Sequence, residues 1–151
     1  MTIHKILSWV AVVIWMILIF NLSSQVAEES NQLSTGITEA IARTIEKVVP
    51  NVEIDTGSFN HIVRKNAHFF AYFVLGILVM NAFRRSVVYG YKSTVLAAAG
   101  CVLYAVSDEI HQLFVPGRGG QVKDVIIDSA GAGASSIIYL LVSRTVKRKK
   151  A

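Results

Sequence analysis

The chain is poor in cysteine, proline and charge. Among 151 residues it has one cysteine and two prolines, and only 17% of its residues are charged. The single Cys101 excludes a disulfide within the chain. The low charge, combined with 53% hydrophobic residues and a mean hydropathy of +0.51, is unusual for a soluble domain of this length. The composition therefore predicts an integral membrane protein.

The long uncharged stretches fall into two classes. Residues 6–27 and 66–83 provide 22 and 18 consecutive residues without a charge, against roughly 20 needed to cross the hydrocarbon core of a bilayer. Residues 93–107 and 129–143 provide only 15 each, which makes about 22 Å of helix against a core of about 30 Å. These two stretches can span a bilayer only if their helices continue through the neighbouring acidic residues.

The resulting prediction is an all-α polytopic membrane protein of a single domain, residues 1–151. Four transmembrane helices are expected at about residues 6–26, 64–83, 93–115 and 124–143, with a basic tail at 144–151. Acidic residues at membrane depth are costly unless they are paired or neutralised, so they mark a functional site by default.

The distribution of positive charge predicts the topology. Four spans put both termini on one side of the membrane, and that side carries nine Lys and Arg residues against six on the other. The positive-inside rule places both termini in the cytoplasm. Because Gln25 and Ala27 form a poor signal-peptidase site, the first span is expected to be retained. The tail at 144–151 is interpreted as an anchor beside anionic membrane lipids, and no nucleic-acid partner is expected.

Polar residues gather at the ends of the spans that this topology places outside. Residues three or four apart share a helix face, so Arg64, His68 and Tyr72 form one inward row. Asp108 with Gln112 and Asp124 with Asp128 form two more. We therefore expect one binding site at the outer end. Its candidate residues are Ser24, Gln25, Arg64, Lys65, His68, Tyr72, Asp108, Glu109, Gln112, Arg118, Asp124 and Asp128.

Small residues in the fourth span predict close helix packing. Gly131 with Ser135 and Ala130 with Ala134 repeat at helical spacing, which lets a neighbouring backbone approach. We interpret these small residues as helix-packing positions and expect the polar rows to form the functional site.

The outer loop at residues 28–63 predicts a further helix. Apolar residues recur in it at helical spacing, with Ser34 or Thr35 as the N-cap and Pro50 as the stop. We expect one amphipathic helix that lies on the membrane surface or over the mouth of the bundle. The apolar positions are Leu33, Ile37, Ile41, Ile45 and Val48.

Taken in chain order, the outer residues resemble a known family, the VanZ-like family of small bacterial membrane proteins. The resemblance covers nearly the whole chain and implies a place in the bacterial cytoplasmic membrane and a role in the cell envelope. The founding member is associated with resistance to the glycopeptide teicoplanin. Where the family commonly has Asn, this chain has Asp128, whose protonation the sequence leaves open. The residues that carry the resemblance are Ser23-Ser24-Gln25, Arg64-Lys65-x-x-His68, Tyr72, Asp108-Glu109-x-x-Gln112, Phe114, Pro116, Gly117, Arg118, Asp124 and Gly131.

An enzymatic hypothesis uses the carboxylates and histidines of this cluster. Asp108, Glu109, His68 and Asp124 are the candidates for general acid and base, while the basic residues hold a phosphate or carboxylate of an envelope lipid. His111 is a further candidate. Asp108, Glu109 and Asp124 also offer hard oxygen ligands to a divalent cation such as Mg²⁺ or Ca²⁺. Two histidines at this spacing do not predict a zinc site, and no nucleophile motif is present.

Two further hypotheses involve no chemistry. In one, the cluster recognises an anionic envelope lipid, a cell-wall precursor or a peptide antibiotic. In the other, Arg64, Lys65 and Arg118 neutralise the four acids as an ion-pair network that sets helix register. We favour binding or modification of an envelope lipid or cell-wall precursor at the outer face, with tolerance to glycopeptide antibiotics as the consequence.

Overall fold

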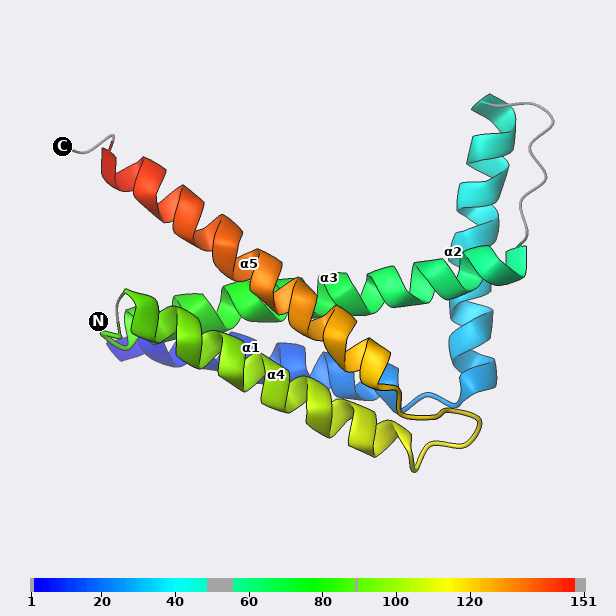
Figure 1. Cartoon of the computed structure of the whole chain (residues 1–151), viewed down its shortest axis with the longest axis horizontal. Coiled ribbons are helices and arrows are strands. Elements are labelled where there is room, and N and C mark those ends of the chain that lie inside the picture. The colour runs from blue at the N-terminus through cyan, green and yellow to red at the C-terminus, as the bar shows by residue number, and fades with distance from the viewer. Residues whose placement is uncertain (1, 49–55, 89, 149–151) are drawn as a thin grey trace.

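The computed structural model describes residues 2–48, 56–88 and 90–148, and its secondary structure there is entirely helical. Pro50 and residues 149–151 of the predicted tail lie outside the described residues. The all-α prediction is confirmed (Figure 1). The helices are α1 (Thr2–Ser23), α2 (Ala27–Val48), α3 (Thr56–Arg85), α4 (Tyr91–Gln112) and α5 (Val122–Arg148).

Four of these helices are long and apolar enough to cross a membrane. The candidate spans are Ile3–Ser23, Ile62–Arg85, Tyr91–Gln112 and Val122–Val142. Large apolar side chains remain exposed along them, as at Ile14 and Leu103, which is expected where lipid takes the place of water. The first residues of α1 and the last turns of α5 lie at the same end of the bundle (Figure 1). We call the opposite end the distal end.

The helix limits differ from the predicted spans in several places. Helix α1 begins at Thr2 and ends at Ser23, where the prediction is 6–26. Helix α3 begins at Thr56, well before residue 64, and α5 continues to Arg148 into the predicted tail. Helix α4 ends at Gln112 and not at residue 115. Its early end has a local cause, because Pro116 disfavours helical geometry in the residue before it. The chain instead forms tight turns, with the Val115 amide donating to the Gln112 carbonyl at 3.1 Å.

Helix α2 crosses the distal end roughly perpendicular to the membrane-spanning helices, and its C-terminal half extends beyond the bundle (Figure 1). The predicted N-cap is wrong, because Ser34 and Thr35 lie inside the helix and donate to the carbonyls of Ser30 and Asn31. The helix begins earlier, where two glutamates in its first turn complement the helix dipole.

The two faces of α2 have different surroundings. The buried face carries the small residues Ser34, Thr38 and Ala42, and Thr38 Oγ1 donates to Asn60 Oδ1 of α3 at 3.4 Å. The apolar side chains of Ile37 and Ile41 are exposed. The apolar stripe is therefore available to an environment outside the protein, and the small face holds α2 on α3.

Helices α3 and α5 form the most extensive helix pair. A Cβ atom at Gly131 would collide with the backbone carbonyl of Phe69, and one at Gly76 would collide with the Ser135 hydroxyl. The predicted close approach at Gly131 and Ser135 is thus confirmed, whereas Ala130 is exposed and takes no part in it. Absence of a side chain at these glycines sets how closely the two helices pack.

Helix α1 is tied to its neighbours by side-chain hydrogen bonds. Trp15 Nε1 donates to the carbonyl of Ala71 on α3 at 2.9 Å, and the Tyr104 hydroxyl of α4 donates to the carbonyl of Met16 at 2.6 Å. These bonds hold α1 against α3 and α4 at the level of the core. The next turns of α1 then bring Ser23 to the distal end.

Candidate functional site

A cavity of about 190 Å³ opens at the distal end of the bundle. It lies between α3, the end of α4, the loop at residues 113–121 and the first turns of α5. We call it the distal cavity. Seven of the twelve candidate site residues line it, together with loop residues and Ile127. The lining residues are Arg64, Lys65, His68, Gln112, Gly117, Arg118, Gly119, Gln121, Asp124, Ile127 and Asp128.

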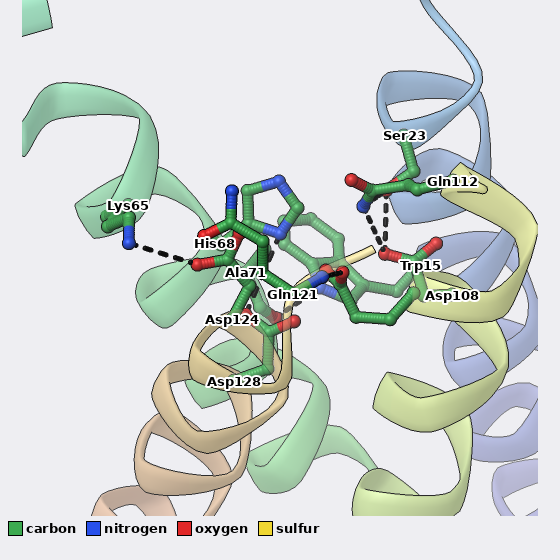
Figure 2. Close-up of polar contacts among 11 residues, drawn as sticks. Trp15, Ser23, Lys65, His68, Ala71, Asp108, Gln112, Gln121, Asp124 and Asp128 are labelled. Atoms are coloured by element: carbon green, nitrogen blue, oxygen red, sulfur yellow. Dashed lines mark hydrogen bonds and ion pairs between the residues drawn. The ribbon is translucent and has the colours of Figure 1, made fainter. Parts of the chain in front are cut away.

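The three cations of the distal cavity are paired unequally. Lys65 Nζ lies 3.2 Å from Asp124 Oδ1 (Figure 2). Arg64 Nη1 instead donates to Asn31 Oδ1 of α2 at 2.9 Å. Within the described part of the chain, neither Arg64 nor Arg118 forms an ion pair with a carboxylate. The proposed neutralising network is therefore reduced to one Lys–Asp pair.

Arg118 is the cation with the most unused hydrogen-bonding capacity. Its Nη2 donates to the Leu22 carbonyl at 3.4 Å, while its buried Nε and Nη1 have no hydrogen-bond partner among the described residues. Burial lowers the pKa of Arg118, and the charge of Arg64 lowers it further, against the opposing effect of Asp108 and Glu109. A guanidinium stays protonated regardless, so Arg118 presents unsatisfied donors to the cavity.

The floor of the cavity is formed by two deeply buried acids, of which Asp128 lines the cavity and Asp108 does not. Asp128 is fully buried, and His68 Nδ1 lies 3.6 Å from its Oδ1. Asp108 is also buried, and its Oδ2 accepts hydrogen bonds from Ser23 Oγ at 2.7 Å and Gln112 Nε2 at 3.4 Å (Figure 2). Four helical segments thus contribute to one polar floor, with α1 supplying Ser23 from beneath.

Glu109 contacts the loop at residues 113–121, unlike its neighbour Asp108. Its Oε2 accepts a hydrogen bond from the backbone amide of Gln121 at 2.8 Å. At Gly120, a Cβ atom would lie 2.7 Å from the Glu109 carbonyl oxygen, so only glycine lets the loop approach this closely. Glu109 therefore anchors the loop that carries Arg118, and it does not line the cavity.

Three of the other candidate residues do not line the distal cavity: Ser24, Gln25 and Tyr72. Ser24 Oγ donates to the Phe20 carbonyl at 2.6 Å and lies 3.1 Å from His111 Nε2. The His111 ring packs on Phe20 with centroids 4.5 Å apart. Tyr72 is fully buried in the core, one turn along α3 from His68.

The sequence pattern predicts Ser24 as a site residue, but in the structure Ser23 contacts Asp108. The two serines are adjacent, and helical phase decides between them. Ser23 follows Ile19 and Trp15 at intervals of four, and these three side chains share the face that contacts the other helices. Counting back along that row would have identified it. Gln121 and Ile127 had no comparable signal.

The metal-ligand group differs from the predicted one. Within the described chain, His68, Asp108 and Asp128 each offer a ligand atom, and these atoms lie within 4.8 Å of one another. The sequence suggested Asp108, Glu109 and Asp124. Glu109 instead bonds the loop, and Asp124 pairs with Lys65. Only Asp108 belongs to both sets.

A model of the VanZ/LLP1 family matches residues 8–143, from the second turn of α1 to the later turns of α5. No curated protein and no solved structure was found to match the chain. The family match covers most of the first candidate membrane helix, all of the other three and every lining residue of the distal cavity, so the chain is a multi-pass membrane protein that belongs to the VanZ/LLP1 family.

Proposed function

We propose that the distal cavity binds the anionic head group of an envelope lipid or cell-wall precursor, and thereby gives tolerance to glycopeptide antibiotics of the teicoplanin type. The observation that carries this proposal is the unsatisfied guanidinium of Arg118 at the cavity. Guanidinium groups bind phosphates and carboxylates through paired, charge-assisted hydrogen bonds. Arg64, which no carboxylate neutralises among the described ion pairs, lines the same cavity.

The size of the cavity supports a lipid head group and not a whole soluble ligand. Its volume of about 190 Å³ is below the roughly 300–1,000 Å³ of pockets that enclose drug-sized molecules. Large apolar side chains are exposed beside the loop, at Leu113, Phe114 and Val122. A phosphate or carboxylate would enter the cavity while an acyl or prenyl tail stays along these side chains and in the bilayer.

The proposed orientation puts the distal end on the outer face of a bacterial cytoplasmic membrane. Positive charge concentrated near the two termini supports cytoplasmic ends. A cysteine replacing Glu39 on α2, whose side chain is 53% exposed, should react with a membrane-impermeant thiol reagent in intact cells. Reaction only after lysis would contradict this orientation.

The alternative function is structural or partner-binding, with the charged cluster as a register device. The Lys65–Asp124 and His68–Asp128 pairs favour it. It predicts that loss of a cavity cation lowers stability. Head-group binding predicts a loss of activity in a normally folded protein. Among the described residues, His68 is the histidine that lines the cavity, whereas His111 packs against α1, so catalysis would use His68 and the carboxylates.

A test compares cations inside and outside the cavity. Arg118→Ala and Arg64→Ala should each reduce teicoplanin tolerance of cells that depend on this protein, with unchanged amounts in the membrane. Arg43→Ala is the matched control, because Arg43 is exposed on α2 and pairs only with Glu39 among the described residues. Equal tolerance in all three variants, or loss of folded protein in the first two, would overturn the proposal.

A further inference from the structure

Three side chains from three different helices meet at the floor of the distal cavity, where His68 and Asp128 line the cavity and Asp108 does not. His68 comes from α3, Asp108 from α4 and Asp128 from α5, and one ligand atom from each lies within 4.8 Å of the others. Figure 2 shows these side chains converging from separate ribbons. We propose that they form a binding site for a divalent transition-metal cation of the Zn²⁺ or Mn²⁺ class. Metal binding at this floor does not depend on the proposed binding of a head group.

The oxygens of this group are buried without sufficient partners. Neither carboxylate oxygen of the fully buried Asp128 has a hydrogen-bond partner in the described residues, and Oδ1 has only the longer 3.6 Å contact with His68 Nδ1. Oδ1 of Asp108, which is 2% exposed, also lacks a hydrogen-bond partner there. The buried Tyr72 hydroxyl also lacks one in this part of the chain. Buried charged oxygens without partners are strongly unfavourable. A cation satisfies several of them at once.

The hydrogen bonds that are present orient Asp108 for this role. Ser23 Oγ and Gln112 Nε2 both donate to Oδ2, at 2.7 and 3.4 Å, and leave Oδ1 free. Ser23 is itself buried and comes from α1. Metal-binding carboxylates are commonly held by such outer hydrogen bonds, which fix the orientation of the ligand atom. Ser23 is therefore a positioning residue for Asp108.

The separations require only small side-chain movement. Zinc binds nitrogen and oxygen ligands at about 2.0–2.2 Å, so ligand atoms in a tetrahedral site lie roughly 3.5 Å apart. Atoms within 4.8 Å of one another reach that spacing by shifts of roughly an ångström. His68 and Asp128 line the cavity, so a metal held there would keep an open coordination position facing it.

The donors and charges select the class of metal. One imidazole nitrogen with two carboxylates suits zinc or manganese, whereas magnesium and calcium prefer oxygen ligands alone. Two carboxylates with a neutral imidazole carry two negative charges, which a divalent cation balances. A proton on His68 would balance only one. The nearby Lys65 is already engaged by Asp124.

The test uses the full-length chain in detergent, freed of metal with a chelator and without added lipid. Zn²⁺ titrated calorimetrically should bind at one equivalent, and Co²⁺ should give the absorption bands of a protein-bound ion. Asp128→Asn and His68→Gln should each weaken Zn²⁺ binding by roughly a hundredfold, and Ser23→Ala by roughly tenfold. Glu109→Gln is the matched control, because this neighbour of Asp108 bonds the loop. It should weaken binding by less than tenfold.

Several results would overturn the metal site. These are no saturable Zn²⁺ or Co²⁺ binding, equal affinity in Asp128→Asn and the wild type, or equal loss in Glu109→Gln and Asp128→Asn. If Asp128→Asn does not fold, the Co²⁺ spectrum of His68→Gln decides, because a ligand replacement must remove or shift the bands. A retained spectrum contradicts the proposal. Because lipid is absent throughout, none of these results depends on head-group binding.

Discussion

Helices α3 and α5 behave differently in the middle of the bundle and at its distal end. In the middle, Gly131 lies against the Phe69 backbone and Gly76 against Ser135, so the helices nearly touch. One and two turns earlier in α5, Asp128 and Asp124 face His68 and Lys65, and the distal cavity opens. The same helix faces therefore carry both a tight contact and a polar site.

Tight packing beside the polar site fixes the positions of the acidic groups between the helices. Because Gly131 follows Asp128 by three residues, any shift of α5 at the glycine would also move the acid away from His68. Close backbone packing sets the register, and the register places the acids. We expect the central contact to contribute stability and the distal groups to detract from it, since buried groups without partners are unfavourable.

The largest expected effect comes from filling the central contact. Gly131→Ala introduces a Cβ that collides with Phe69 and should lower the free energy of unfolding by about 3 kcal/mol, the upper range for overpacking. Gly133→Ala is the control, because nothing lies within 4 Å of its Cβ. It should be neutral or stabilising by about 0.5–1 kcal/mol. Unfolding of both variants in mixed micelles measures this, and equal stability would refute the role of Gly131.

At the distal end we expect a smaller change in the free energy of unfolding, and one of opposite sign. Asp128→Leu removes two buried oxygens that lack hydrogen-bond partners among the described residues. In metal-free protein it should leave the free energy of unfolding unchanged or raise it by about 1–3 kcal/mol, because buried ionic groups are often replaced by apolar ones without loss. Activity should be lost at the same time. A variant that unfolds more readily would favour the structural alternative.

A smaller effect is expected from the ion pair between Lys65 and Asp124. The side chains of Lys65 and Asp124 are 28% and 25% exposed. Partly exposed ion pairs contribute about 0–1 kcal/mol to the free energy of unfolding. A double-mutant cycle with Lys65→Ala and Asp124→Ala should give a coupling free energy below about 1 kcal/mol. Coupling of several kcal/mol would show that the cluster is a structural network.

The smallest expected effect is a difference in fluorescence between two faces of α2, with no change in stability. Ile37 and Glu39 are similarly exposed in the protein, at 56% for Ile37 and 53% for the Glu39 side chain, but lie on different faces. Cysteines at the two positions, in a Cys101→Ala background, can carry an environment-sensitive fluorophore in vesicles. Emission should shift to the blue at residue 37 alone if the apolar face meets lipid. Equal emission would indicate that α2 stands clear of the bilayer.

The sequence predicted the membrane helices well because hydrophobic length is a local property. It also predicted which end of the bundle carries the polar groups, since their positions along the spans can be counted. It could not separate Asp108 from Glu109. These neighbours point about 100° apart on α4, and only the path of the loop at residues 113–121 decides which of them bonds the Gln121 amide.

The faces of α2 show a second limit of sequence reasoning. The apolar stripe is the stronger pattern, but the contact with α3 uses the small residues Ser34, Thr38 and Ala42. In a membrane protein the apolar face does not need to meet protein, because lipid can cover it. Pairing of Arg64 with Asn31 of α2, 33 positions earlier, likewise depends on tertiary structure.

The central claim is that the cations of the distal cavity hold an anionic head group. Native mass spectrometry of the full chain, offered equal amounts of a prenyl phosphate and the prenol of the same length, tests this directly. The wild type should retain the phosphate and not the alcohol, and Arg118→Ala should retain roughly tenfold less, as expected for the loss of a charge-assisted hydrogen bond. Equal retention of the two lipids, or undiminished retention by Arg118→Ala, would contradict the account.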